Sequence, residues 1–233
     1  MPVPLVDLDG FYGTHRVILL DLELTCWEGS LESDWSDPAR PPEVIEIGLA
    51  AYDILHGNVL DTFSARVRPR VNPVLSEYCK SLVRISQDEI DRSRPLAAVL
   101  ENVGDWCIRA RATDVPTCSW GSDRGFLSAD AGCSNCGDPF GLSPHMDLRS
   151  MFQSLLGYPS GAACERDRLR EVLGLGPNHH RHRALDDAVD LAQFCRALRR
   201  RLAVRREEVP GTSSLRSHDD SDDRMGRHGS TPR

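Results

Sequence analysis

The sequence predicts an α/β fold in which a mixed β-sheet carries helices on both of its faces. Two observations lead to this prediction. Three apolar segments joined by polar turns occupy residues 16–67, which is typical of consecutive antiparallel strands. After residue 95, helical segments with one apolar face alternate with short apolar strands. Neighbouring strands followed by alternating helices and strands build a sheet with both antiparallel and parallel pairs.

The first three strands are expected to form an antiparallel meander. Residues 16–23 are mostly apolar and predict a strand that is buried for most of its length. A loop rich in Pro, Ser and Asp over residues 29–42 separates it from a second strand at 43–52. A turn at 56–58 then leads into the third strand at 59–67.

The rest of the chain is predicted to add two short strands and a series of helices. Strands at 115–120 and 145–148 complete a five-stranded sheet. Apolar residues at helical spacing mark 95–111, and a similar stripe faces the core along the last helix, 184–205. The other helices are expected at 73–82, from 86 on, at 123–131, up to 156 after the fifth strand, and at 164–173.

Length and composition predict one globular domain with an appendage. The chain has 233 residues, of which 40% are hydrophobic and 27% charged. Residues 1–205 are predicted to form the domain, while 206–233 have almost no large apolar residues and are predicted to be a disordered tail. No apolar run reaches the roughly 20 residues of a membrane span. The N-terminus has no signal-peptide pattern, so we expect a cytoplasmic protein without membrane attachment, and no protein partner is indicated.

The net charge of −7 at first opposes binding to nucleic acid, because phosphates attract lysine and arginine. Carboxylates that hold divalent cations nonetheless present a positive face to a substrate once the cations are bound. The acidic balance therefore does not exclude a nucleic-acid substrate.

Eight cysteines stand mostly in apolar or helical surroundings, and we expect them to be reduced thiols. Cys133 and Cys136 form the one Cys-x-x-Cys pair. A structural zinc site needs about four ligands, and no second pair of cysteines or histidines stands at the usual spacing. Two ordinary loop cysteines are the favoured interpretation, and a zinc-stabilised scaffold is the alternative.

Asp21 and Glu23 lie at the end of the first predicted strand, separated by one residue. Residues i and i+2 of a strand point to the same face, so the two carboxylates project together while Leu22 points away. Carboxylates that repel each other in apolar surroundings need a cation or a shared proton, and oxygen-rich sites suit Mg²⁺ or Mn²⁺. The alternative is that the strand has reached the surface, where acidic residues are common.

Asp123 follows the strand that ends in Trp120 and Gly121, at the carboxyl end where open α/β sheets bind ligands. This position makes Asp123 a candidate metal ligand. The alternative is a helix N-cap, because Ser122 and Asp123 both favour that position. Trp120 is interpreted as a core residue rather than a platform for base stacking.

His182 and Asp187 frame the segment His-Arg-Ala-Leu-Asp-Asp. Residues five apart on a helix are rotated by about 140°, so the two converge only if His182 lies in the loop before the helix. A histidine there can accept a proton from water near neutral pH. The alternatives are a solvated loop, since His179 and His180 stand close by, and plain first-turn acids at Asp186 and Asp187.

Together these residues resemble the motif of a known family. An Asp-x-Glu, a later Asp and a His-x-Ala-x-x-Asp in this order are similar to the DEDDh 3′-to-5′ exonucleases, which have an RNase H-like fold. The resemblance is closest to the branch with the histone-mRNA exonuclease, the enhancer-of-RNA-interference proteins and their bacterial relatives. It covers about residues 16–200 and includes 20–26, 43–48, 67–69, 75–79, 85–90, 119–121, 145–148 and 182–187.

The resemblance makes the predicted domain an RNase H-like exonuclease domain with a two-metal mechanism. Asp21, Glu23, Asp123 and Asp187 would hold two Mg²⁺ ions, which Mn²⁺ can replace, and His182 would be the general base. The implied activity is metal-dependent hydrolysis of phosphodiester bonds in single-stranded RNA or short single-stranded 3′ ends. Nucleoside 5′-monophosphates would be released one at a time, with RNA favoured over DNA.

By the same resemblance, Leu24, Thr25 and Trp27 border the pocket for the terminal nucleotide. The chain departs from the family before Asp123, which only one residue separates from the preceding Ser-Trp-Gly, where two are common. It also has Val-Arg-Ile at 83–85, where the family often has Thr-Gly-Ile. Two alternatives stay open: a DNA-directed 3′-to-5′ exonuclease, and a catalytically impaired RNase H-like module that binds nucleic acid.

Overall fold

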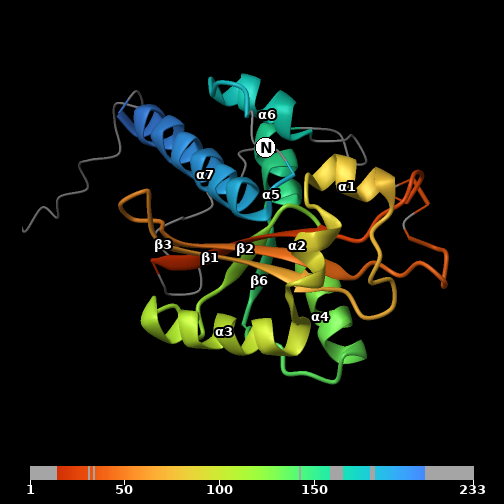
Figure 1. Ribbon diagram of the computed structural model, residues 1–233. Helices are drawn as coiled ribbons and strands as arrows, with labels where there is room; N and C mark the ends of the chain where they lie inside the picture. Colours follow the sequence, from red (N-terminus) through yellow and green to blue (C-terminus); the bar gives the residue numbers. More distant parts are fainter. Residues whose placement is uncertain are drawn as a thin grey trace, which may run out of the picture.

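The described residues fold into one mixed sheet between two layers of helices (Figure 1). The computed structural model describes residues 15–30, 32–33, 35–141, 143–157, 165–178 and 182–207, with side chains up to residue 201. The strands are β1 (Arg16–Leu24), β2 (Val44–Asp53), β3 (Asn58–Arg68), β4 (Arg94–Pro95), β5 (Thr117–Ser119) and β6 (His145–Asp147). The helices are α1 (Glu77–Val83), α2 (Gln87–Asp91), α3 (Leu96–Arg109), α4 (Asp123–Cys133), α5 (Leu148–Leu156), α6 (Arg166–Leu173) and α7 (Ala184–Glu207).

The strand order of the sheet is β4-β3-β2-β1-β5-β6. β1, β2 and β3 pair antiparallel, as the predicted meander requires, and β5 and β6 continue the sheet parallel to β1. The five predicted strands are confirmed, but the sheet has a sixth. In β4, Arg94 and Pro95 pair in parallel with Val67 and Arg68 of β3. A strand of two residues is too short to show apolar alternation, and β4 forms only by pairing with a distant segment. The local sequence therefore does not predict this strand.

The alternation of side chains along β1 connects the sheet to both helix layers. Ile18, Leu20 and Leu22 pack in one buried cluster with residues of α3 and α4. Val17 and Leu19 pack in a second cluster with residues of α5, α6 and α7. Figure 1 shows these two helix layers below and above the sheet. Helices on both faces, as predicted, are therefore confirmed.

Capping residues set the bounds of several helices. α1 begins later than predicted, because Ser76 accepts a hydrogen bond from the backbone N–H of Cys79 at 3.0 Å. Ser86 forms a capping box with Glu89 at the start of α2, where a short helix was predicted to begin. α7 extends slightly past its predicted end at residue 205.

Some predictions fall on parts of the chain outside the described ranges. The predicted tail lies outside them from residue 208 on. So does Cys164, where a helix was predicted to start; that helix begins at Arg166. The domain boundary at 205 and the cytoplasmic location stay predictions. Within the ranges given above, none of the helices combines the length and the hydropathy that a membrane crossing requires.

Candidate active site

Asp21 and Glu23 stand at the carboxyl end of β1, next to the parallel strand β5. Leu22 packs with α3 and α4 on one face of the sheet, so the two acids point to the other face, toward α7. Only 5% of Asp21 and 7% of Glu23 are exposed. The alternative of an exposed strand end is therefore wrong, and the predicted shared face is confirmed.

Asp187 joins these acids from the first turn of α7. This helix starts against β2 at Gly48, where an added Cβ would overlap the backbone of Ala184. Gly48 pairs with Asp21 in the sheet, so the close approach of α7 carries Asp187 toward Asp21. One carboxylate oxygen from each of Asp21, Glu23 and Asp187 lies within 4.8 Å of the others. We call these three buried acids the carboxylate cluster.

Glu46 of β2 fixes the start of α7. Its carboxylate accepts a hydrogen bond from the backbone N–H of Ala184 at 3.1 Å and pairs with the Arg183 guanidinium at 3.0 Å. Only 1% of Glu46 is exposed. This role was not predicted, although a lone acid between Ile45 and Ile47 in a buried strand is a signal that it has a fixed partner.

His182 lies in the loop before α7, as its convergence with Asp187 requires. Its backbone N–H donates to the Asp187 carboxylate at 3.0 Å, and its φ of 64° is left-handed. The half-buried side chain lines the same cleft as Asp123. His179 and His180 lie outside the described residues. His182 is thus placed to exchange a proton with a group bound in the cleft.

Asp123 is the first residue of α4 and lines the cleft. Ser122 precedes it without a side-chain cap hydrogen bond, so capping does not account for this pair. Burial raises the pKa of Asp123 well above its usual range, and the negative charges of Asp21 and Asp187 raise it further. Asp123 therefore lies outside the 4.8 Å carboxylate cluster but within its electrostatic reach.

Gly121 makes a tight backbone turn between β5 and Asp123, where the chain has one residue fewer than the family commonly has. Its φ of +88° suits glycine, which has no Cβ to clash in this region. The Asp147 carboxylate holds the turn by accepting the Gly121 N–H at 2.8 Å, and it caps α5 by accepting the Arg149 N–H at 2.9 Å. The shortened spacing consequently leaves Asp123 in the cleft.

The cleft beside the carboxylate cluster has a volume of about 460 Å³. Leu24 and Trp27 line it, as expected for a nucleotide pocket. Thr25, also predicted there, is placed differently: its hydroxyl donates to the Pro41 carbonyl at 3.1 Å and accepts the Glu43 N–H at 2.9 Å. That buried side chain stabilises the loop before β2. The aromatic residues of the cleft are Trp27, Trp35, Tyr78, Trp120 and Phe126.

Trp120 is both a core residue and part of the cleft. Its ring centre lies 6.3 Å from that of Phe152 and 5.8 Å from that of Phe194, in the cluster beneath α7. The same side chain borders the cleft. The predicted core role is confirmed, and the half-buried residue also lines the cleft.

Arg166 begins α6 and reaches into the carboxylate cluster. Its guanidinium lies 2.5 Å from Asp21 Oδ1 and 3.3 Å from Asp187 Oδ1. Even so, burial raises the pKa of Asp21 to about 7 and that of Glu23 to about 9, and neighbouring carboxylates add to both shifts. The Arg166 guanidinium, which lowers both pKa values, therefore does not outweigh the effect of burial. This arginine was not predicted as a site residue.

The donor set of the carboxylate cluster fits a hard divalent cation. The group consists of carboxylate oxygens, which are the ligands that Mg²⁺ and Mn²⁺ prefer. A bound cation would also favour the ionised forms of Asp21 and Glu23, whose pKa values burial raises. The arrangement can hold a divalent metal beside a histidine, as metal-assisted hydrolysis requires.

We expect the metal-free protein to lose stability as the pH rises. Asp21 and Glu23 have pKa values of about 7 and about 9 in the folded protein, against ordinary values of 3.8 and 4.5. Because the unfolded chain releases these protons at lower pH, the free energy of unfolding falls between about pH 4 and about pH 9. Thermal melts in EDTA check this. Added Mg²⁺ or Mn²⁺ should remove most of the slope, and a flat profile in EDTA contradicts the assigned protonation.

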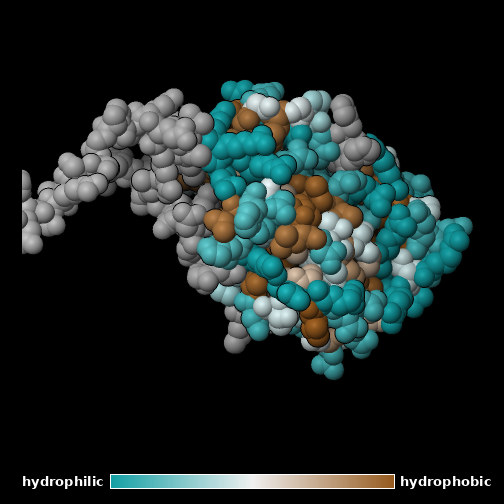
Figure 2. All heavy atoms as spheres, turned by 90° about the vertical axis from the view of Figure 1, so that its left-hand side faces the viewer, coloured by the Kyte–Doolittle hydropathy of each residue, from teal (hydrophilic) through white to brown (hydrophobic). Residues whose placement is uncertain are grey.

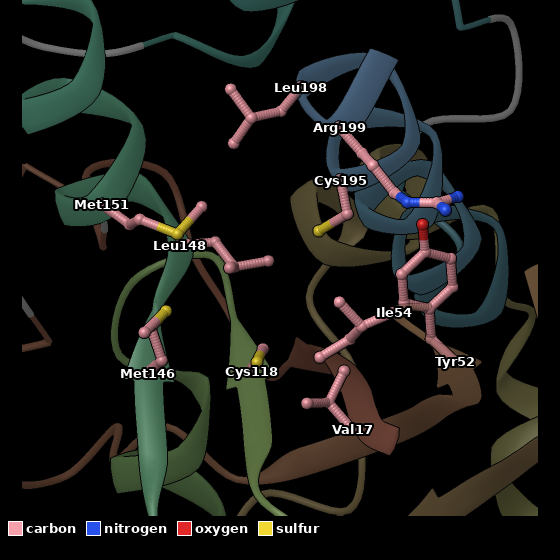
Figure 3. Close-up of a pocket in the computed structure, with 10 residues that line it drawn as sticks. All are labelled: Val17, Tyr52, Ile54, Cys118, Met146, Leu148, Met151, Cys195, Leu198 and Arg199. Carbon is pink, nitrogen blue, oxygen red and sulfur yellow. The ribbon is translucent and has the colours of Figure 1, made fainter. Parts of the chain in front are cut away.

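A second, apolar pocket lies away from the carboxylate cluster (Figure 3). Val17 lines it at the opposite end of β1, about 13 Å along the strand from Asp21. It holds about 40 Å³ and is surrounded by two methionines and two cysteines. The face of the molecule in Figure 2 likewise gathers hydrophobic side chains in its middle, with hydrophilic ones around them. The described residues that line the apolar pocket include no acid and no histidine, so we assign the chemistry to the cleft.

Cys133 is the last residue of α4 and Cys136 lies in the loop after it, so the prediction that both are loop cysteines is wrong for Cys133. Both are free thiols, as are the other described cysteines, and the Cys136 thiol donates to the Ala131 carbonyl at 3.5 Å. Among the described residues, the acids around Asp21 are the one group close enough to hold a metal. None of the described cysteines is disulfide-bonded, and Cys164 lies outside the described residues.

Comparison with known protein sequences agrees with this geometry. The family model described as Exonuclease (RNase_T) matches residues 18–194. The 3′-5′ exoribonuclease 1 of Mus musculus is 28% identical over 193 residues, which are 80% of this chain and 53% of that protein. The 3′-5′ exonuclease Snipper of Drosophila melanogaster is 27% identical over 202 residues, which are 78% of this chain and 69% of Snipper. This chain thus spans about half the length of the first of these relatives.

Solved structures have the same fold. The nuclease domain of 3′hExo, a DEDDh family member bound to rAMP, gives a TM-score of 0.70 at 24% identity, over 80% of this chain and 92% of that one. A 3′-exonuclease described by its 3′-end specific recognition of histone mRNA stem-loop gives a TM-score of 0.70 at 23% identity. The match covers 80% of this chain and 82% of that one. The predicted RNase H-like fold is confirmed by this likeness. Since the family model matches more than half of its residues, the chain belongs to the exonuclease family.

Proposed function

We propose that this chain is a metal-dependent 3′-to-5′ exonuclease that hydrolyses phosphodiester bonds of single-stranded RNA or short single-stranded 3′ ends. The observation that carries the proposal is the meeting of Asp21, Glu23 and Asp187 within 4.8 Å. Asp123 and His182 line the cleft beside them. These five residues come from three distant parts of the chain, in β1, at the start of α4 and around the start of α7, so sequence neighbourhood alone does not bring the three parts together. Membership of the exonuclease family supports the same function.

In this proposal the carboxylate cluster and Asp123 hold two divalent ions, Mg²⁺ or Mn²⁺. When bound, such a pair activates water and offsets the charge of the reacting phosphate. His182 accepts the proton of the attacking water, because its side chain lines the cleft and its backbone is fixed by Asp187. Glu46 and Gly48 keep α7, and with it Asp187, against the sheet.

The cleft favours an unpaired terminal nucleotide. Trp27, Trp35 and Trp120 offer rings on which bases can stack whatever their sequence, and Leu24 adds apolar contact. Arg149 also lines the cleft, where its guanidinium can bind a phosphate. The preference for RNA over DNA is supported by relatives named exoribonucleases and by the solved relative described as recognising a histone mRNA stem-loop.

Matched RNA and DNA oligonucleotides test the proposal. RNA labelled at its 5′ end should shorten one nucleotide at a time in Mg²⁺ or Mn²⁺ and release nucleoside 5′-monophosphates. A blocked 3′ end should stop the reaction, because the terminal nucleotide must enter the cleft, and EDTA should abolish it. Internal cleavage, or intact RNA and DNA with both ions present, contradicts the proposal. Faster loss of DNA than of RNA favours a DNA-directed exonuclease.

A binding module without catalysis is the second candidate, because Asp123 lies outside the carboxylate cluster. Such a module would retain single-stranded nucleic acid without releasing nucleotides at any Mn²⁺ concentration. Titration of Mn²⁺ in the same oligonucleotide assay therefore separates the two candidates. Nucleotide release that saturates with Mn²⁺ supports the exonuclease.

A further inference from the structure

Arg166 occupies the space between two of the proposed metal ligands. Its Nη2 lies 2.5 Å from Asp21 Oδ1, and its Nη1 lies 3.3 Å from Asp187 Oδ1. Only 13% of the arginine side chain and 7% of each acid are exposed, so solvent screens these pairs weakly. The guanidinium also lies 5.7 Å from the ring centre of Trp120, which borders the cleft. Arg166 is therefore part of the buried site.

The guanidinium and a divalent ion would compete for the same carboxylates. The contacts of Arg166 use an oxygen of Asp21 and an oxygen of Asp187, and both acids belong to the group that would hold the ion. Two cations this close repel each other strongly in a buried place. Because arginine stays protonated in proteins, it can leave the site only by moving, not by losing its charge.

We propose that Arg166 is the resident counter-cation of the metal-free carboxylate cluster, and that divalent ions bind by displacing its guanidinium from Asp21 and Asp187. This inference rests on the proposed metal-dependent function. Arg166 is the first residue of α6, whose buried anchors, Leu169 and Leu173, come later in the helix. Its long side chain can therefore turn away while α6 stays packed. The apparent affinity for metal is then lower than it would be without Arg166. Only those protein molecules whose carboxylates are free of the guanidinium can bind the ion.

Calorimetric titration of Mn²⁺ into protein without nucleic acid tests this inference. Arg166→Ala should tighten Mn²⁺ binding about tenfold if the arginine leaves the carboxylates free about a tenth of the time. Arg168→Ala is the matched control, because it removes the same charge from the same helix while Arg168 is exposed and pairs with Glu171. Its affinity should equal that of the wild type. Arg166→Lys keeps the charge but loses the two-pronged contact, so its affinity should fall between the two.

Two further readouts separate displacement from a general effect of charge. Mn²⁺ should raise the melting temperature of Arg166→Ala more than that of the wild type, because tighter binding to the folded state stabilises it more. Tryptophan fluorescence of the wild type should change when Mg²⁺ moves the guanidinium away from Trp120. The change should be absent from Arg166→Ala and from Trp120→Phe.

An unchanged or weaker Mn²⁺ affinity in Arg166→Ala overturns the inference. If that variant does not fold, the comparison of Arg166→Lys with the wild type tests the inference instead. Equal Mn²⁺ affinities of these two proteins, together with no Mg²⁺-dependent change in the fluorescence of the wild type, contradict displacement. The nuclease assay is independent of these measurements. RNA cleavage combined with unchanged affinity in Arg166→Ala refutes this inference alone, whereas tighter binding without any RNA cleavage refutes the proposed function alone.

Discussion

Exchange of Asp21 for asparagine should lower the rate of RNA cleavage by about a thousandfold or more. The amide keeps the size of the side chain but removes the charge that would hold a metal ion. The same charge pairs with Arg166 at 2.5 Å and lies within 4.8 Å of Glu23 and Asp187. The exchange therefore disturbs the electrostatics of the whole cluster while leaving β1 intact. Initial rates on 5′-labelled RNA in saturating Mg²⁺ measure the effect.

Asp105→Asn is the matched control for this experiment. Asp105 is an exposed acid on α3, on the opposite face of the sheet, so the variant should keep the wild-type rate. Melts in EDTA at about pH 5 should show both variants folded, because asparagine resembles the protonated carboxyl that Asp21 carries well below its pKa of about 7. Cleavage by folded Asp21→Asn at close to the wild-type rate contradicts the assigned role.

Gly48→Ala should remove most of the nuclease activity through a steric effect, without changing the charge of the site. A methyl group there would overlap the backbone of Ala184 at the start of α7. Backbone cannot turn aside as a flexible side chain can, so α7 must shift and Asp187 shifts with it. Overpacking of this kind costs about 1–3 kcal/mol in stability, and displacement of a catalytic group by about 1 Å can lower a rate about a hundredfold.

Gly104→Ala and Gly132→Ala isolate this steric effect. Both glycines lie within helices, α3 and α4, and a Cβ at either position meets nothing within 4 Å. These exchanges should keep the cleavage rate and raise the melting temperature, because alanine favours a helix over glycine by about 1 kcal/mol. Melting curves and cleavage rates of the three variants are measured side by side. If Gly48→Ala is as stable and active as the wild type, α7 does not depend on this close approach.

The acids of β1 and the residues at the start of α7 were predictable because local rules place them. Two-residue alternation puts Asp21 and Glu23 on one face of a strand, whatever covers that face. A loop followed by the first turn of a helix brings His182 and Asp187 close together, and the His182 backbone N–H donates a hydrogen bond to the Asp187 carboxylate. Most strands and helices follow from apolar periodicity for the same reason.

Features that join distant segments could not be predicted in this way. Arg166 meets Asp21 across 145 positions of sequence, and its own helix gives it no feature that distinguishes it from Arg168. Glu46 and Gly48 are simply parts of a buried strand until α7 is placed on them. β4 likewise exists only through its pairing with β3. These contacts depend on the tertiary arrangement, which local patterns do not specify.

Anomalous diffraction from crystals grown with Mn²⁺ and a nucleoside 5′-monophosphate tests the central claim most directly. The account predicts manganese bound by Asp21, Glu23 and Asp187, with Asp123 beside a second ion and His182 facing the phosphate. Manganese bound only elsewhere, with no ion among these three carboxylates, would contradict it.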